Sequence, residues 1–203
     1  MKFKLRRERG GLAGLVAAAT LVMAAGGAQA QSVKLRVADS FPIGHFIPEY
    51  ATKFWMNEVT KNSNKTIEFE YFPAEQLGKA KDMLALTQSG VIDIGYVVPT
   101  YVQDKMPLTA VAELPGTFRS SCEGTMAFWK LATGDGVLAK REYQPNGTRV
   151  MFAIVMPPYQ IFSGAKPLGN LKSVEGMKLR TTGGAQDTLV TKLKGVPVRM
   201  AAP

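Results

Sequence analysis

The first hundred residues of the chain alternate between strand patterns and helix patterns, and this order limits the folds that the chain can adopt. At 33–38 apolar and polar side chains alternate at first, which predicts a strand. Over 48–59 apolar side chains recur every three or four positions, which predicts an amphipathic helix. The later segments of this part are a predicted strand at 66–72, a helix at 79–89 and a strand at 92–98.

The third of these strands carries the most information about the sheet. Residues 92–98 are apolar at nearly every position, a pattern typical of a strand covered on both faces. The helix before it ends at Gly90, a residue type favoured just after a helix. The order β-α-β-α-β therefore predicts an α/β fold with helices flanking a sheet.

The pair Pro157-Pro158 divides the rest of the chain. Before it lie a predicted helix at 120–139 and a predicted strand at 148–155. Two consecutive prolines favour a stiff, extended segment, so we place a domain boundary here, with the first lobe at 31–157 and the beginning of a second at 158–203. The patterns after the boundary predict strands at 160–163 and 176–182, a helix at 186–193, and a strand and turn at 196–203.

The N-terminus has the layout of a cleavable signal peptide at 1–30. Five Lys and Arg residues precede the apolar run 12–25, and Ala28-Gln29-Ala30 offers small residues for cleavage after Ala30. The apolar run is shorter than the roughly 18 residues that a membrane span requires. We therefore expect a periplasmic protein that is not itself embedded in the membrane.

Composition argues against several classes of protein. Part of the formal charge of +9 lies in the first 30 residues, and the rest is scattered among acidic residues, so nucleic acid is not an expected partner. With Cys122 and His45 as the only cysteine and histidine, we expect a buried thiol, no disulfide and no Cys/His metal cluster. The chain lacks a Gly-x-Ser-x-Gly motif, and Asp93 follows a helix-ending glycine, which favours a turn role. We expect neither an enzyme nor a cofactor.

Four local patterns, taken in order, resemble the solute-binding proteins of tripartite ATP-independent periplasmic (TRAP) transporters, of the DctP type. The resemblance covers essentially all of the chain after residue 30. The patterns are FPAEQLG at 72–78, GVIDIG at 90–95, ELP at 113–115, and KPL at 166–168 leading into LKSVEGMKLR at 171–180.

The resemblance implies a two-lobed periplasmic-binding-protein-like fold with a cleft between the lobes. Members of the family are longer, so the second lobe is expected to be incomplete in this chain. The implied function is that of an extracytoplasmic receptor that binds a small organic acid and delivers it to TRAP membrane subunits. The alternatives are a receptor for an ATP-driven importer or a sensor, a secreted α/β enzyme, and a fragment without function.

The resemblance also implies one principal ligand contact. Arg180 matches a family arginine that grips the substrate carboxylate, and a guanidinium can donate two parallel hydrogen bonds to such a group. From its residue type alone, Arg180 is more typical of a surface ion pair. Gln160 stands where some members have a second arginine, which favours a monocarboxylate, such as a hydroxy, 2-keto or aromatic acid, over a dicarboxylate.

Further candidates lie at the carboxyl ends of predicted strands, where open α/β sheets place their ligands. Each has an alternative role: a loop histidine often caps local backbone, and a tyrosine near a strand often belongs to the core. The candidates are His45 after the first strand, Gln76 after the second, Tyr96 and Tyr101 at or after the third, and Tyr159 beside Gln160.

Overall fold

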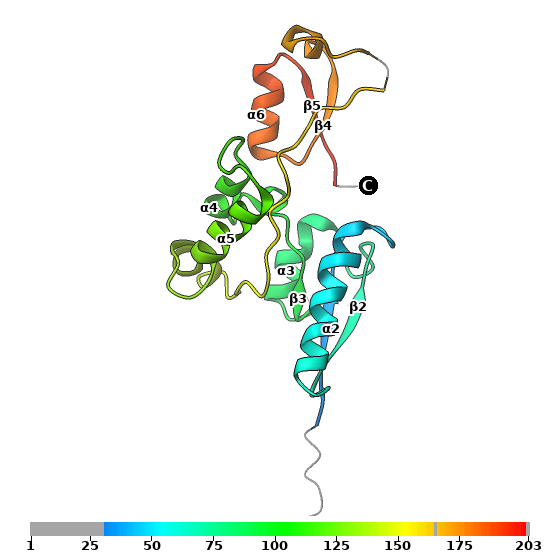
Figure 1. The fold of residues 1–203 in the computed structure, drawn as a ribbon, viewed down its shortest axis with the longest axis vertical. Helices are drawn as coiled ribbons and strands as arrows, with labels where there is room; N and C mark the ends of the chain where they lie inside the picture. Colours follow the sequence, from blue (N-terminus) through cyan, green and yellow to red (C-terminus); the bar gives the residue numbers. More distant parts are fainter. Residues whose placement is uncertain (1–30, 165, 202–203) are drawn as a thin grey trace, which may run out of the picture.

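The structure, a computed structural model, describes residues 31–164 and 166–201. The expected signal peptide at 1–30 lies outside these residues. The described chain contains two parallel sheets, one of three strands in the order β2-β1-β3 and one of two strands, β4-β5. Figure 1 shows the sheets in different parts of the molecule. Within the described ranges, no helix is long and apolar enough to cross a membrane.

The first strand pairs in parallel with the second strand along its whole length. Strand β1 (Val33–Ala38) pairs with β2 (Ile67–Phe72), in agreement with the sequence patterns. Strand β3 is only Ile94–Gly95, shorter than the predicted strand at 92–98, because it pairs with just the last two residues of β1. Ile92 is nevertheless fully buried. Its apolar side chain is thus explained by its place in the core and not by a longer strand.

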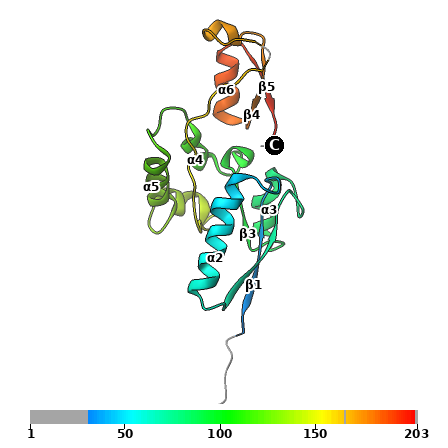
Figure 2. The same cartoon turned by 45° about the vertical axis from the view of Figure 1, so that its right-hand side comes forward.

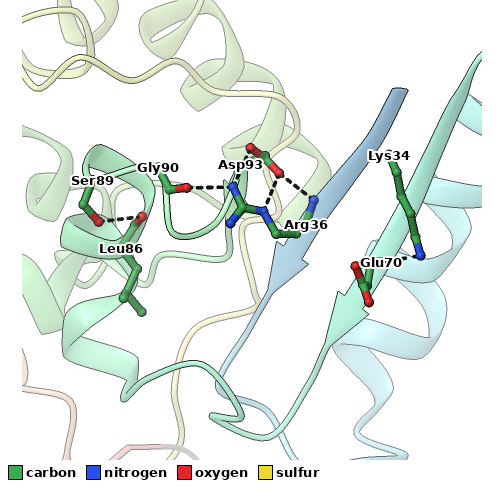
Figure 3. A network of polar contacts seen from close by, with 7 residues as sticks. All are labelled: Lys34, Arg36, Glu70, Leu86, Ser89, Gly90 and Asp93. Atoms are coloured by element: carbon green, nitrogen blue, oxygen red, sulfur yellow. Dashed lines mark hydrogen bonds and ion pairs between the residues drawn. The ribbon is translucent and has the colours of Figure 1, made fainter. Parts of the chain in front are cut away.

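A polar network fixes the junction between β1 and the turn before β3 (Figure 3). The backbone N–H and Nε of Arg36 donate to Asp93 Oδ2 at 2.7 and 3.1 Å. The Nη2 group of Arg36 donates to Asp93 Oδ1 at 3.2 Å and to the carbonyl of Gly90 at 2.7 Å. Asp93 thus has the turn role expected from its position after the glycine.

Two helical segments flank this sheet, as predicted. They are the π-helical η1 (Pro48–Thr52) continued by α2 (Lys53–Asn62), and the 3-10 turn η2 (Ala80–Asp82) continued by α3 (Met83–Gln88). Trp55 of α2 packs on Phe69 of β2, with ring centroids 5.2 Å apart. The buried core between the elements is formed by Ala38, Met83 and Ile92, surrounded by Phe72, Leu77, Leu86 and Val97.

A group of short helices follows the first sheet. They are η3 (Pro99–Val102), α4 (Pro107–Ala110), η4 (Val111–Glu113), α5 (Ser121–Ala132) and η5 (Ala139–Tyr143). The Ser120 hydroxyl accepts a hydrogen bond from the backbone N–H of Glu123 and caps the start of α5, as predicted. The helix ends at Ala132 and not at 139, two residues before Gly134, which has a φ of +54°. Cys122 in its first turn is exposed, so the expectation of a buried thiol is wrong; the buried positions of α5 are occupied by Gly124 and Ala132.

The predicted strands at 148–155 and 160–163 are wrong. The first is an extended segment with no ladder partner among the described residues. Its backbone instead contacts α5, since Val155 N donates to Thr125 Oγ1 at 3.0 Å. Its Phe152 ring stacks on Trp55 at 5.2 Å, so the segment packs across α2.

The last part of the chain forms a parallel β-α-β unit. Its elements are η6 (Leu171–Val174), β4 (Lys178–Thr181), α6 (Gly184–Lys192) and β5 (Val196–Arg199). The strands pair in register from Lys178↔Val196 to Thr181↔Arg199, which confirms the strand and helix patterns predicted for this region. Figures 1 and 2 show the unit at the end of the molecule opposite the start of β1. The domain boundary at Pro157-Pro158 stays a prediction.

Candidate functional site

Two of the predicted site residues meet between the first sheet and the β-α-β unit. Arg180 lies in β4 and Tyr101 in η3, and the Nη2 of Arg180 donates to the Tyr101 hydroxyl at 3.2 Å. The Nε of Arg180 donates to the carbonyl of Met200 at 3.0 Å. A guanidinium has five N–H donors, so with two used by the described residues the half-buried group keeps donors for an anion.

The turn that follows Arg180 comes very close to η3. Gly183 and Gly184 both have positive φ, at +111° and +53°. A Cβ on Gly184 would lie 2.4 Å from Gln103 Oε1, and one on Gly183 would lie 3.4 Å from the carbonyl of Thr100. The glycine pair therefore allows the backbone of this turn to approach η3 and bring Arg180 to Tyr101.

A buried carboxylate that the sequence analysis missed lies at the carboxyl end of β1. Asp39 is 0% exposed; its Oδ1 accepts from Phe41 N at 3.0 Å and its Oδ2 from the Tyr71 hydroxyl. Burial raises the pKa of Asp39, and the hydrogen bond from Tyr71 opposes this shift. An aspartate directly after a strand is a signal that could have identified it, because open α/β sheets bind ligands at that edge.

His45 and Tyr96 gather around one ring beside this carboxylate. The Phe41 ring stacks on His45 at 4.6 Å and meets the ring of Tyr96 edge-on at 5.1 Å. Burial raises the pKa of Tyr96 to about 12, with smaller contributions from Asp39 and Tyr159. Because the Nδ1 of His45 accepts from Ile47 N at 3.2 Å, its backbone-capping role is confirmed.

The other three predicted residues are exposed. Gln160 Nε2 donates at 3.4 Å to the carbonyl of Pro158 in its own segment, and the Tyr159 side chain is 67% exposed. Gln76 lies in the turn after β2. Within the described chain no hydrogen bond joins Gln76 or Gln160 to Arg180.

A cavity of about 280 Å³ is lined by Ser40, Pro42, Ala74, Glu75 and Ala201. Its walls come from the carboxyl ends of β1 and β2 and from the residue after Met200, whose carbonyl contacts Arg180. A larger hollow of about 460 Å³ lies near the end of α2, and none of the candidate residues lines it. None of the predicted residues lines the 280 Å³ cavity either, but its wall includes Ser40, which follows Asp39, and Ala201, which follows Met200. Among the described residues, no group of His, Cys, Asp or Glu side chains could hold a metal ion.

Comparison with known proteins places these features in a family. Residues 38–202 match the family described as bacterial extracellular solute-binding protein, family 7. A curated solute-binding protein of Albidiferax ferrireducens is 24% identical over 162 residues, which cover 78% of this chain and 46% of that protein.

Two solved structures have the same fold. A TRAP solute-binding protein of Rhodoferax ferrireducens in complex with copurified benzoate is 24% identical, with a TM-score of 0.74 over 85% of this chain and 52% of that one. A marine-metagenome TRAP solute-binding protein from an unidentified microbe, specific for aromatic acid ligands and in complex with metahydroxyphenylacetate, is 26% identical. Its TM-score is 0.75, over 83% of this chain and 52% of that one.

The chain spans about half the length of these relatives. They are two-lobed α/β binding proteins, which confirms the fold class expected from the sequence. The family match begins at Ala38, the last residue of β1, and runs to residue 202, so it includes all the later strands. The chain belongs to the bacterial extracellular solute-binding proteins of family 7 (DctP), the family of TRAP solute-binding proteins.

Proposed function

We propose that this chain forms part of an extracytoplasmic receptor that binds a small organic acid for a TRAP transporter, with Arg180 as the carboxylate anchor. One observation carries the proposal: Arg180 is oriented by Tyr101 and by the Met200 carbonyl, and these contacts among the described residues use two of its five N–H donors. A guanidinium fixed in this way can bind a carboxylate through two charge-assisted hydrogen bonds.

The preferred ligand in this proposal is a monocarboxylate with an apolar or aromatic body. In the family resemblance, the neutral Gln160 matches a position at which some members have a second arginine, which would favour a second acidic group. The rings of His45 and Tyr96, which are partly exposed, pack on the buried Phe41 ring near the end of β1 and offer contacts for a flat apolar body. The relatives that bind benzoate and metahydroxyphenylacetate support this ligand class.

The other predicted side chains have secondary roles in the proposal. Gln76, Gln160 and Tyr159 are exposed in the described chain and would reach the ligand when the cleft closes. Ligand binding would favour the closed form over the open one, and the closed form would deliver the acid to the membrane subunits. The receptor would work in the periplasm after removal of residues 1–30.

The experiment is a thermal-shift screen of the chain against mono- and dicarboxylic acids, each paired with its neutral amide. A ligand at 100 times its Kd stabilises the folded state by about 2.7 kcal/mol. For a chain of this size this corresponds to a rise in Tm of about 5–10 °C. We expect such a rise with one class of monocarboxylate and not with its amide. No rise with any acid, or equal rises with acid and amide, would contradict the proposal.

A further inference from the structure

Glu113 makes a contact that lies outside the proposed carboxylate site. It ends η4, and its Oε1 accepts a hydrogen bond from the backbone N–H of Thr100 at 3.2 Å. Thr100 is 5% exposed, so this backbone N–H is in the interior. Burial raises the pKa of Glu113, while its contacts with Thr100 lower it by less. Partial burial of a carboxylate costs solvation, and here the carboxylate satisfies a backbone donor at the start of η3.

The segment from Thr100 to Gln103 makes three contacts with the β-α-β unit. The carbonyl of Thr100 faces Gly183, the Tyr101 hydroxyl accepts from Arg180, and Gln103 lies against Gly184. All three belong to η3 or its immediate end. The orientation of η3 therefore determines where the Tyr101 hydroxyl meets the guanidinium.

We propose that Glu113 is a positioning residue for the Arg180–Tyr101 pair: its carboxylate holds the start of η3 so that Tyr101 can orient the guanidinium. The inference deepens the proposed function, because it assigns a further determinant of affinity to the same carboxylate anchor. It requires the acceptor oxygen of Glu113 and not its charge. A glutamine, which keeps one acceptor oxygen, should therefore substitute for it and an alanine should not.

The first test needs no ligand. In NMR spectra of the whole chain, Glu113→Ala is expected to speed amide exchange at Thr100 by about tenfold, the equivalent of 1.4 kcal/mol of lost protection. It should also move the Arg180 Nε–H resonance in the same direction as Tyr101→Phe does. Glu113→Gln should leave both signals near their wild-type values.

The matched control is Glu123→Ala. Glu123 also accepts a hydrogen bond from a backbone N–H, that of Arg119 at 3.1 Å, but it does so at the start of α5. Its removal should leave the Arg180 signal unchanged. If Glu113→Ala does not fold, Glu113→Met fills the same space without an acceptor oxygen and takes its place.

The second test uses the acid that gives the largest thermal shift with the wild-type chain. Glu113→Ala is expected to weaken its binding about tenfold, and Glu113→Gln by less than about threefold. If Glu113 acts through Tyr101, the double variant with Tyr101→Phe should bind no more weakly than the weaker of the two single variants. Additive losses would overturn the inference.

The two tests separate this inference from the proposed function. If no acid binds to the wild-type chain, the proposed function fails, and the ligand-free spectra alone decide the role of Glu113. An Arg180 Nε–H resonance that does not move in Glu113→Ala would overturn the positioning role, even if the chain binds an acid.

Discussion

The hydroxyl of Tyr101 accepts a hydrogen bond at 3.2 Å from the Nη2 of Arg180, 79 positions further along the chain. This contact links η3, which follows the first sheet, to strand β4 of the β-α-β unit. It leaves the guanidinium held on one side by Tyr101 and on another by the Met200 carbonyl. The pair thus connects η3 to the second sheet, and in the proposed function its guanidinium binds the carboxylate of the ligand.

Tyr101→Phe removes this hydrogen bond and keeps the ring. Because the guanidinium then loses one of the two acceptors that the described residues give it, we expect affinity for an acid ligand to fall about three- to tenfold, equivalent to roughly 0.7–1.4 kcal/mol. Calorimetric titration measures the change. The control is Tyr50→Phe, the same substitution at a side chain that is 82% exposed, and a similar loss there would refute the assignment.

Asp39→Asn tests the buried carboxylate. Burial raises the pKa of Asp39 above its ordinary value of 3.8, so between that value and the raised pKa the folded state binds more protons than the unfolded state does. The free energy of unfolding therefore falls as pH rises through this window. An asparagine does not titrate, and its amide oxygen can still accept from Phe41 N, so the variant should lose this part of the pH dependence.

Urea unfolding at a series of pH values from about 4 to 7 measures the effect of Asp39→Asn. The matched control is Asp104→Asn, which removes the same charge from an exposed position. A pH slope in Asp39→Asn equal to that of the wild-type chain would show that the buried carboxylate does not control it.

Asp93→Ala tests the network that joins β1 to β3 (Figure 3). Hydrogen bonds from Arg36 lower the pKa of Asp93, so its contribution to stability is present above the ordinary pKa and is lost as pH falls. At pH 7 we expect Asp93→Ala to lower Tm by about 2–4 °C. The control is Glu70→Ala, whose pairing with Lys34 is exposed and 3.8 Å long and should contribute little. Equal shifts in the two variants would contradict the prediction.

Sequence patterns predicted most elements whose hydrogen bonds are local or whose partner strands lie close in the chain. Strand β1 and helices α2 and α6 are examples. Their burial was not predictable in the same way, because burial in β1 increases along the strand without alternating and Phe54 of α2 is 63% exposed. The segment 148–155 has the composition of a strand, but a strand also needs a partner, and composition does not report one. Its contacts go instead to Thr125 and Trp55.

The residues of the candidate site were named from the sequence, but the contact between Arg180 and Tyr101 was not predictable from it. Arg180 and Tyr101 were identified separately, one from a family resemblance and the other from its position after a strand. That they touch depends on the glycine turn at 183–184 and on η3, which bring distant segments together. Asp39 was missed because a single aspartate after a strand resembles ordinary turn chemistry until its burial is known.

The measurement that decides whether Arg180 anchors a carboxylate compares one acid with its neutral amide in three proteins. Calorimetric titrations would use the acid with the largest thermal shift, with the wild-type chain and Arg180→Ala, and the exposed Arg141→Ala as the charge-matched control. We expect the wild-type chain to prefer the acid by at least about tenfold, or 1.4 kcal/mol, and Arg180→Ala to lose that preference. A change in acid affinity below about threefold in Arg180→Ala, roughly 0.7 kcal/mol, would show that the anchor lies elsewhere.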